Sequence, residues 1–403
     1  MSDFYQTGVV ATLHRLGNRN GKVVAKGLKE NPDIRKTALV LPALYSEFQG
    51  EAIHNIFKEL ESVNFLSEIV LTLGGANKAQ FNEVREYFKK IPYPVKIVWA
   101  TGPRVERLIK LLSKNDLYLG EDGKGRSVWL AYGYIIARGE SKAIALHDCD
   151  IVTYNKDLLG RLVFPIANSS MGFEFCKGYY SRVTDRMHGR VTRLFITPII
   201  RALIRIIGHH PLLEYLDSFR YPLAGEFSMT IDLARANRIP SDWGLEIGTL
   251  AEVYRNCSPS RICQVDLADN YEHKHQELSA DNPSKGLMKM CIDIAKTIFY
   301  TLSTEGVVLT EGIMRTLPAT YLRTAQDTVK RYEDDAIING LYFDRHEEVT
   351  AVEAFTKAIQ IAAKEYLENT LGALEIPSWN RVVSALPNIL EMFVEAVEKD
   401  NKS

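Results

Sequence analysis

The chain has 403 residues, of which 46% are hydrophobic and 25% are charged. A chain of this length predicts about two domains and has ample apolar material for a core. Its formal net charge is −1, from 49 basic and 50 acidic side chains, which argues against general nucleic-acid binding because that function needs a basic excess. Any site for an anion must therefore be local.

The cysteines and the apolar segments bear on where the protein works. The five cysteines are Cys149, Cys176, Cys257, Cys263 and Cys291. Their odd number and the lack of a CxxC pair argue against a disulfide framework or a zinc site, so we expect a cytoplasmic protein. The first residues do not resemble a signal peptide. Residues 194–208 are the most apolar stretch, but proline and arginine interrupt it, so we expect a buried or amphipathic helix and no membrane span.

In the first part of the chain, short β-branched runs alternate with amphipathic stretches. This order predicts an α/β fold with a mostly parallel sheet covered by helices on both faces. Ligands of such sheets bind at the carboxyl ends of the strands. Neither the GxGxxG nor the GxxxxGK[ST] pattern occurs, which disfavours dinucleotide oxidoreductases and P-loop proteins. We expect strands at residues 37–41, 68–71, 95–99, 143–147 and 262–267, and helices at residues 51–63, 80–90 and 105–113.

The pattern changes from about residue 284, where strand signals end and long helical patterns begin. Residues 352–371 and 382–398 are the clearest of these patterns. We therefore expect a catalytic domain of residues 1–280 and an all-α C-terminal extension of residues 281–403. The apolar faces of these helices need a partner, so we expect them to pack on the catalytic domain or to form a homodimer.

Two acidic residues, Asp148 and Asp150, follow the strand at residues 143–147 directly. At a strand end they point into the crevice where ligands bind, and their hard oxygen atoms suit Mg²⁺ or Mn²⁺. The alternative is a solvated turn, because two carboxylates separated by one residue are a weak motif alone.

Two basic segments could bind an anion. Lys124 lies between two glycines, which let the backbone approach a ligand while the ammonium group reaches a phosphate. Residues 189–192, Gly-Arg-Val-Thr, open a helix whose free amides attract anions. Arg182, Arg186 and Arg190 repeat every four residues and would share a face if this stretch is helical. The alternatives are a flexible basic loop and a solvated basic face.

Two further segments place acids or histidines where they could act. Glu226 and Glu246 each stand near glycines and could bind sugar hydroxyls or accept a proton, although helix capping explains them equally well. His273, in the segment Glu-His-Lys-His of residues 272–275, could bind Mn²⁺ alongside carboxylates. A solvated histidine is the alternative.

In this order along the chain, these segments resemble the glucosyl-3-phosphoglycerate synthases, retaining glycosyltransferases of the GT-A fold. The resemblance runs from about residue 39 to residue 276 and implies a Rossmann-like, mostly parallel sheet flanked by helices. The matching pieces are Leu41-Pro42-Ala43-Leu44, Gly123-Lys124-Gly125 with Trp129, Asp148-Cys149-Asp150, Lys177, Gly189-Arg190-Val191-Thr192, Leu223-Ala224-Gly225-Glu226, Gly244-Leu245-Glu246-Ile247-Gly248 and Glu272-His273.

The resemblance also implies a role for each matching residue, in a reaction that moves glucose from a nucleoside-diphosphate glucose to 3-phosphoglycerate. Asp150 would bind Mg²⁺ or Mn²⁺, with His273 as the second ligand. The implied donor-binding residues are Pro42, Ala43, Leu44, Lys124 and Asp148. The implied acceptor-binding residues are Gly189, Arg190 and Thr192, and the residues at the reaction centre are Glu246, Leu223 and Asp148.

Two segments depart from the family pattern, and both lie near the expected site of the nucleotide base. Residues 72–77, Thr-Leu-Gly-Gly-Ala-Asn, replace an acidic, serine-rich turn, and residues 45–47, Tyr-Ser-Glu, are less acidic than in the family. The base of the donor therefore stays open between UDP, GDP and ADP.

Alternatives to glucosyl transfer remain at this stage. Mannosyl transfer, or free glycerate as the acceptor, would need only small changes in the site. A nucleotidyltransferase would release pyrophosphate, and a sugar-nucleotide sensor would bind the donor without turnover. No evident carboxylate nucleophile occurs in these motifs, so we follow the family in expecting same-face attack assisted by the departing phosphate, with retention of configuration.

Overall fold

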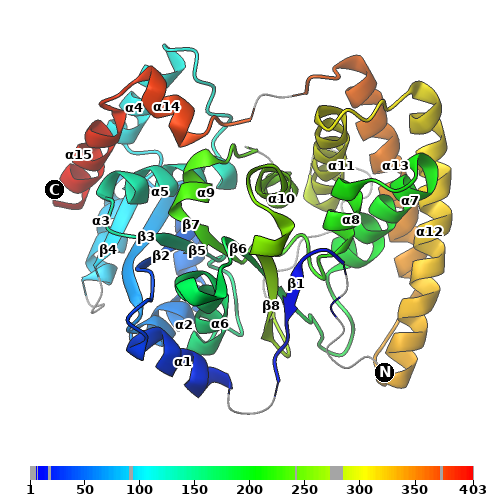
Figure 1. Ribbon diagram of the computed structural model, residues 1–403, viewed down its shortest axis with the longest axis horizontal. Helices are drawn as coiled ribbons and strands as arrows, with labels where there is room; N and C mark the ends of the chain where they lie inside the picture. Colours follow the sequence, from blue (N-terminus) through cyan, green and yellow to red (C-terminus); the bar gives the residue numbers. More distant parts are fainter. Residues whose placement is uncertain are drawn as a thin grey trace.

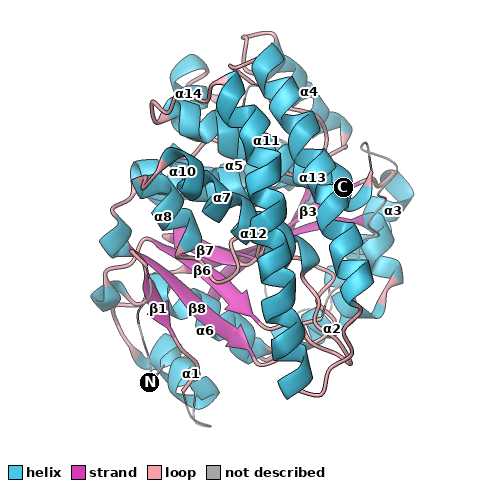
Figure 2. Cartoon of the chain, turned by 90° about the vertical axis from the view of Figure 1, so that its right-hand side faces the viewer, coloured by secondary structure: helices cyan, strands magenta, loops and turns pink. Residues whose placement is uncertain are grey.

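A computed structural model describes residues 6, 8–16, 20–89, 94–240, 243–272, 285–372 and 375–402. Within these residues eight strands form a single sheet in the order β1-β8-β6-β7-β5-β2-β3-β4 (Figures 1 and 2). Only β7 runs antiparallel to its neighbours, β5 and β6, so the sheet is mostly parallel, as expected. The strands are β1 (Ala11–Leu13), β2 (Thr37–Leu44), β3 (Leu66–Gly74), β4 (Val95–Trp99), β5 (Ala143–Leu146), β6 (Phe175–Tyr180), β7 (Phe227–Thr230) and β8 (Ile262–Ala268).

Helices cover both faces of the sheet (Figure 2), because successive strand residues point to opposite faces and both sets are apolar. Along β2, for example, Val40 belongs to one hydrophobic cluster, whereas Leu39 and Leu41 belong to the other. One cluster takes in α1 (Asn20–Glu30), α2 (Glu51–Leu60), α3 (Lys78–Phe88) and α6 (Lys156–Ala167); the other takes in α4 (Pro103–Ser113), α5 (Lys124–Arg138), α9 (Ile231–Ala236) and α10 (Leu245–Asn256).

The C-terminal helices pack on the rest of the chain in two places (Figure 1). The first group lies beside η3, α7 and α10, and the second returns to α4, α5 and the edge strand β4. The first group is α11 (Gly286–Thr304), α12 (Glu311–Ile338) and α13 (Arg345–Glu368), and it lies on the same side as η3 (Val191–Ile196), α7 (Thr197–Ile207) and α8 (Pro211–Asp217). The second group is α14 (Trp379–Ala385) and α15 (Ile389–Lys402), on the opposite side in Figure 1. The remaining short helices are η1 (Tyr45–Gln49), η2 (Ser169–Met171) and η4 (Pro259–Arg261).

The side chain of Asn401 shows how the last helix is docked. Its amide donates to the carbonyl of Ile97 at 2.8 Å and accepts from the amide of Ile97 at 3.0 Å. It thus occupies backbone groups on the free edge of β4, which would otherwise be open to pairing with another strand. The division at residue 280 remains our proposal, because that position lies outside the described residues.

Several elements differ from the sequence-based expectation. The expected helix at residues 382–398 is two helices, α14 and α15, because Pro387 cannot continue α14 and the residue before it, Leu386, has a non-helical backbone with φ −136° and ψ 85°. Arg182 and Arg186 do not lie on a helix, since the residues before Arg190 form a loop with a bridge between Val183 and Met187. The short strands β1, β6 and β7 were not expected.

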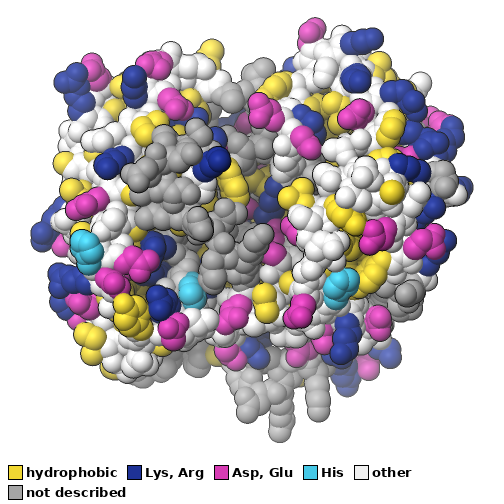
Figure 3. All heavy atoms as spheres, turned by 180° about the vertical axis from the view of Figure 1, so that it is seen from behind, with side chains coloured by type: hydrophobic (Ala, Val, Ile, Leu, Met, Phe, Trp, Pro, Cys, Tyr) yellow, Lys and Arg dark blue, Asp and Glu magenta, His cyan; other side chains and the backbone are white. Residues whose placement is uncertain are grey.

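The remaining global expectations concern the surface and the thiols. In the part of the chain that is described, no helix offers a long enough apolar stretch to cross a bilayer. All five cysteines are buried and carry free thiols. Figure 3 shows basic and acidic side chains interspersed over the face behind Figure 1, in keeping with the near-neutral charge of the chain.

Candidate active site

A cavity of about 890 Å³ lies at the carboxyl ends of β2, β3, β5 and β6, where a parallel sheet is expected to bind ligands. The C-terminal helices also contribute to its wall, through residues of α11 and of the turn that leads into α13. It brings together every residue to which the resemblance gave a donor, acceptor, metal or reaction-centre role except His273, which lies outside the described residues. Glu226, the other acid considered, does not line it. The expected residues that line it are Pro42, Ala43, Leu44, Lys124, Asp148, Asp150, Gly189, Arg190, Thr192, Leu223 and Glu246.

One end of the cavity is acidic. Burial and the charge of Asp148 raise the pKa of Asp150 to about 6, and burial together with Asp150 and Asp148 raises the pKa of Glu47 to about 7. Burial is the larger cause of both shifts, and repulsion between the neighbouring carboxylates adds to it. A divalent cation would relieve that repulsion. Among the described residues no group of three or more His, Cys, Asp or Glu side chains could hold a metal ion. The oxygen donors fit Mg²⁺ or Mn²⁺, because Mg²⁺ commonly uses one or two carboxylates with water and phosphate oxygens.

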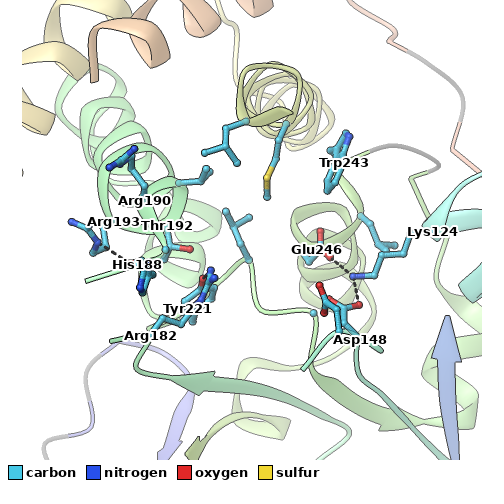
Figure 4. A pocket seen from close by; sticks show the side chains of 18 of the residues that line it. Lys124, Asp148, Arg182, His188, Arg190, Thr192, Arg193, Tyr221, Trp243 and Glu246 are labelled. Atoms are coloured by element: carbon cyan, nitrogen blue, oxygen red, sulfur yellow. Dashed lines mark hydrogen bonds and ion pairs between the residues drawn. The ribbon is translucent and has the colours of Figure 1, made fainter. Parts of the chain in front are cut away.

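Lys124 is held between two of the expected acids (Figure 4). Its ammonium nitrogen lies 2.6 Å from Oδ1 of Asp148 and 3.1 Å from Oε1 of Glu246. Burial opposes the charge, but the two carboxylates together raise the pKa of Lys124 above its ordinary value, so it stays an ammonium. Gly225 permits this arrangement, since a Cβ at that position would collide with the carboxylate of Asp148.

The two acids proposed near glycines have different positions. Glu246 lies in the first turn of α10 and lines the cavity. Glu226 is buried and accepts hydrogen bonds from the hydroxyls of Tyr180, at 2.8 Å, and Tyr271. Burial and the nearby charge of Asp148 raise its pKa to about 7. Glu226 therefore does not line the cavity; it lies behind Tyr180, which does.

The opposite end of the cavity is cationic, and Figure 4 shows its side chains across from Lys124. Gly189 has a φ of +72°, a left-handed backbone that favours glycine, and turns the chain into η3. The basic side chains of this end come from the loop, which carries Arg182, Arg186 and His188, and from the helical segment after it, which carries Arg190 and Arg193.

Arg190 forms ion pairs with two carboxylates from the C-terminal part of the chain. Its Nε lies 3.0 Å from Oε1 of Glu348, and one terminal nitrogen lies 2.8 Å from Oε1 of Glu347. Sequence reasoning missed both acids. Its one available signal was Asp344 three residues before Glu347, which predicts a helix start, and Asp344 does accept the backbone amide of Glu347 at 2.9 Å.

Comparison with known proteins decides the family. No family model matches the chain. It is 47% identical over 401 residues to the glucosyl-3-phosphoglycerate synthase of Persephonella marina, covering 100% of this chain and 99% of that protein. It is 41% identical over 408 residues to the synthase of Methanococcoides burtonii, covering 99% and 98% of the two chains. The chain belongs to the glucosyl-3-phosphoglycerate synthase family.

Solved structures agree with this family at the level of the fold. The glucosyl-3-phosphoglycerate synthase of Mycobacterium tuberculosis, in complex with Mn²⁺, UDP and phosphoglyceric acid, has a TM-score of 0.51 and 22% identity over 74% of this chain and 87% of that one. The mannosyl-3-phosphoglycerate synthase of Rubrobacter xylanophilus has a TM-score of 0.53 and 20% identity over 72% and 80%. The GT-A fold expected from the sequence is thereby confirmed.

Proposed function

We propose that this member of the glucosyl-3-phosphoglycerate synthase family transfers glucose from a nucleoside-diphosphate glucose to 3-phosphoglycerate, with Mg²⁺ or Mn²⁺ as the cofactor. The observation that carries the proposal is a single cavity with carboxylates and Lys124 at one end and a group of arginines at the other. A donor that needs a metal and an acceptor that carries several negative charges fit those two ends.

The acidic end is our proposed donor site. Pro42, Ala43 and Leu44, at the end of β2, would contact the nucleotide, and Lys124 would bind the diphosphate in place of part of its present contact with Asp148. A divalent ion held by Asp150, and by His273 as its proposed second ligand, would stabilise the negative charge that builds on the departing diphosphate.

The cationic end is our proposed acceptor site, with Gly189, Arg190 and Thr192 around the acceptor's phosphate. The acceptor hydroxyl would attack the anomeric carbon on the face that the diphosphate leaves. A new carbon–oxygen bond forms as the bond to the diphosphate breaks, and the hydroxyl proton passes to a diphosphate oxygen. Because attack and departure take place on the same face, the configuration of the anomeric carbon is retained. Leu223 and Glu246 would line this reaction centre, so positioning and electrostatics carry most of the catalysis.

The primary test is an assay of UDP-, GDP- and ADP-glucose and of the matching mannose donors against 3-phosphoglycerate and glycerate. Release of the nucleoside diphosphate with a glucose donor and 3-phosphoglycerate is the expected result, and turnover with glycerate alone would contradict it. In Arg190→Ala, the acceptor KM should rise by about one to two orders of magnitude while the donor KM stays unchanged.

We also propose that the protein is a cytoplasmic homodimer. The five free, buried thiols suit a reducing compartment. Ile337 and Ile338, at the end of α12, are 71% and 83% exposed and offer apolar surface for a second copy. Light scattering of the wild type and of a variant with both residues changed to serine tests the dimer, which should dissociate in the variant.

A further inference from the structure

Glu348 connects the two arginines that face the acceptor end of the cavity. It is on α13, and its side chain is only 7% exposed. One carboxylate oxygen lies 3.0 Å from Nε of Arg190, and the other lies 3.0 Å from a terminal nitrogen of Arg193. The contact to Arg190 is a hydrogen bond, whereas the contact to Arg193 is an ion pair without hydrogen-bond geometry. The buried carboxylate therefore orients Arg190 directly and holds Arg193 beside it by charge.

Arg193 is itself anchored and gives the bridge a rigid end. Its Nε donates to the carbonyl of His188 at 2.9 Å, and a terminal nitrogen donates to the carbonyl of Met187 at 3.3 Å. Its guanidinium also stacks over the ring of Tyr332, 4.9 Å from the centroid. The orientation of Arg190 is therefore set by α13 and by this anchored neighbour.

Glu347 has a different environment from Glu348. Its side chain is 50% exposed and lines the cavity, and its Oε1 lies 2.8 Å from a terminal nitrogen of Arg190. An ion pair so exposed contributes little to stability, because water and salt screen it. A phosphate can offer Arg190 two oxygens at once, so it can replace this carboxylate.

The turn before α13 is also tied to the arginine loop. Tyr342 donates its backbone amide to the carbonyl of Asp185 at 2.8 Å, and its ring lies 4.6 Å from the guanidinium of Arg186. The start of α13 and the loop of residues 181–189 therefore form one connected wall of the cavity.

We propose that the start of α13 completes the acceptor site, with Glu348 as a positioning residue for Arg190 and Glu347 as a counter-ion that the acceptor's phosphate displaces. The inference rests on the proposed function, because it assigns Arg190 to an anionic acceptor. It gives the C-terminal extension a part in acceptor binding, and it assigns opposite effects to two adjacent glutamates.

Steady-state kinetics of three single variants test this, with donor and acceptor varied separately. In Glu348→Gln the acceptor KM should rise by about 10- to 100-fold. In Glu347→Gln it should fall by about two- to fivefold, because the competing charge is gone. The donor KM should stay unchanged in both. Glu353→Gln is the matched control, since Glu353 lies on the exposed side of the same helix.

The outcomes separate this inference from the proposed function. If the wild type does not use 3-phosphoglycerate, the proposed function fails. If it does, but both variants keep the wild-type acceptor KM, or both raise it equally, the inference alone is overturned. Because Glu347 is half exposed, its variant should fold normally and give a clear answer even if Glu348→Gln is unstable.

Discussion

Trp129 and Trp379 stack face to face, with ring centroids 4.1 Å apart and planes inclined by 15°. Each indole nitrogen donates to a backbone carbonyl on the other side of the contact, Trp129 to Pro377 at 2.8 Å and Trp379 to Trp129 at 3.0 Å. Trp129 is on α5, the helix that begins at Lys124. The last part of the chain is therefore packed on the helix that carries a principal residue of the donor site.

This stack makes a test possible at Gly133. A Cβ at this position would collide with the ring of Trp379, so we expect Gly133→Ala to lower the free energy of unfolding by about 1–3 kcal/mol. In Gly312→Ala, the atom nearest to the added Cβ is Oγ1 of Thr310 at 3.7 Å. We therefore expect the free energy of unfolding of this variant to stay unchanged or to rise by up to about 1 kcal/mol. Denaturant unfolding measures both, and equal stability of the two variants would show that Trp379 yields without cost.

The metal assignment predicts the behaviour of Asp150→Asn. The variant keeps the size of the side chain but loses a charged metal ligand, so its turnover should fall by about two orders of magnitude or more with its fold unchanged. EDTA should likewise abolish turnover of the wild type, and added Mg²⁺ or Mn²⁺ should restore it. Asp33→Asn, at an exposed turn, should behave as the wild type. Full activity in a folded Asp150→Asn variant would remove Asp150 from the metal site.

The sequence pattern was a good guide where a strand contains a run of aliphatic residues. The expected strand at residues 95–99 coincides with β4, and those at residues 37–41 and 68–71 lie within β2 and β3. It failed for β1, β6 and β7, which have three, six and four residues. Length alone does not explain this, since β5 has four residues and was expected. None of the three missed strands contains a run of aliphatic residues, and a local pattern does not reveal the neighbours on which their pairing depends.

The candidate site was predictable to the extent that it follows from the sheet. Acids after a parallel strand must lie at the ligand-binding edge, and Asp148 and Asp150 do so. The contacts of Arg190 were not predictable, because Glu347 and Glu348 are 157 and 158 residues away. Their position depends on how α13 packs against η3, which the local sequence of neither segment specifies.

The raised pKa of Glu226 predicts how stability depends on pH. Its pKa is about 7 in the folded protein against 4.5 ordinarily, so between these values the folded state holds a proton that the unfolded state has lost. The contribution of Glu226 to stability therefore decreases as pH rises through this window, by at most about 1.4 kcal/mol per pH unit.

Glu226→Gln should remove this dependence, because an amide does not titrate. Its free energy of unfolding, relative to the wild type, should increase steadily from pH 5 to pH 7 and then level off. Glu353→Gln, on the exposed side of α13, should show no such trend. A difference between Glu226→Gln and the wild type that is the same at pH 5 and pH 7.5 would mean that the carboxyl group is already ionised at pH 5.

Lys177 carries a buried ammonium group whose desolvation lowers the stability of the folded enzyme. The side chain, on β6, is 1% exposed, and its Nζ has no hydrogen-bond partner among the described residues. It lies 5.4 Å from the ring centroid of Phe227. Burial lowers its pKa to about 8, although Glu246 and Glu226 oppose this shift. At pH 7 the group is therefore still a buried ammonium.

Replacing Lys177 by methionine should make the protein more stable, because a side chain of similar length then occupies the same space without a desolvated charge. We expect Lys177→Met to raise the free energy of unfolding at pH 7 by about 1–3 kcal/mol. Above pH 8 the Lys177 side chain of the folded wild type releases its proton, whereas the same side chain in the unfolded chain keeps it up to about pH 10.5. The wild type therefore becomes more stable in this range, and the stability difference between the variant and the wild type should shrink.

Denaturant unfolding at pH 7 and pH 9.5 measures both effects. Lys357→Met, on the exposed side of α13, should change little at either pH. A Lys177→Met variant less stable than the wild type at pH 7 would show that the ammonium group stabilises the acids around it by more than its burial costs.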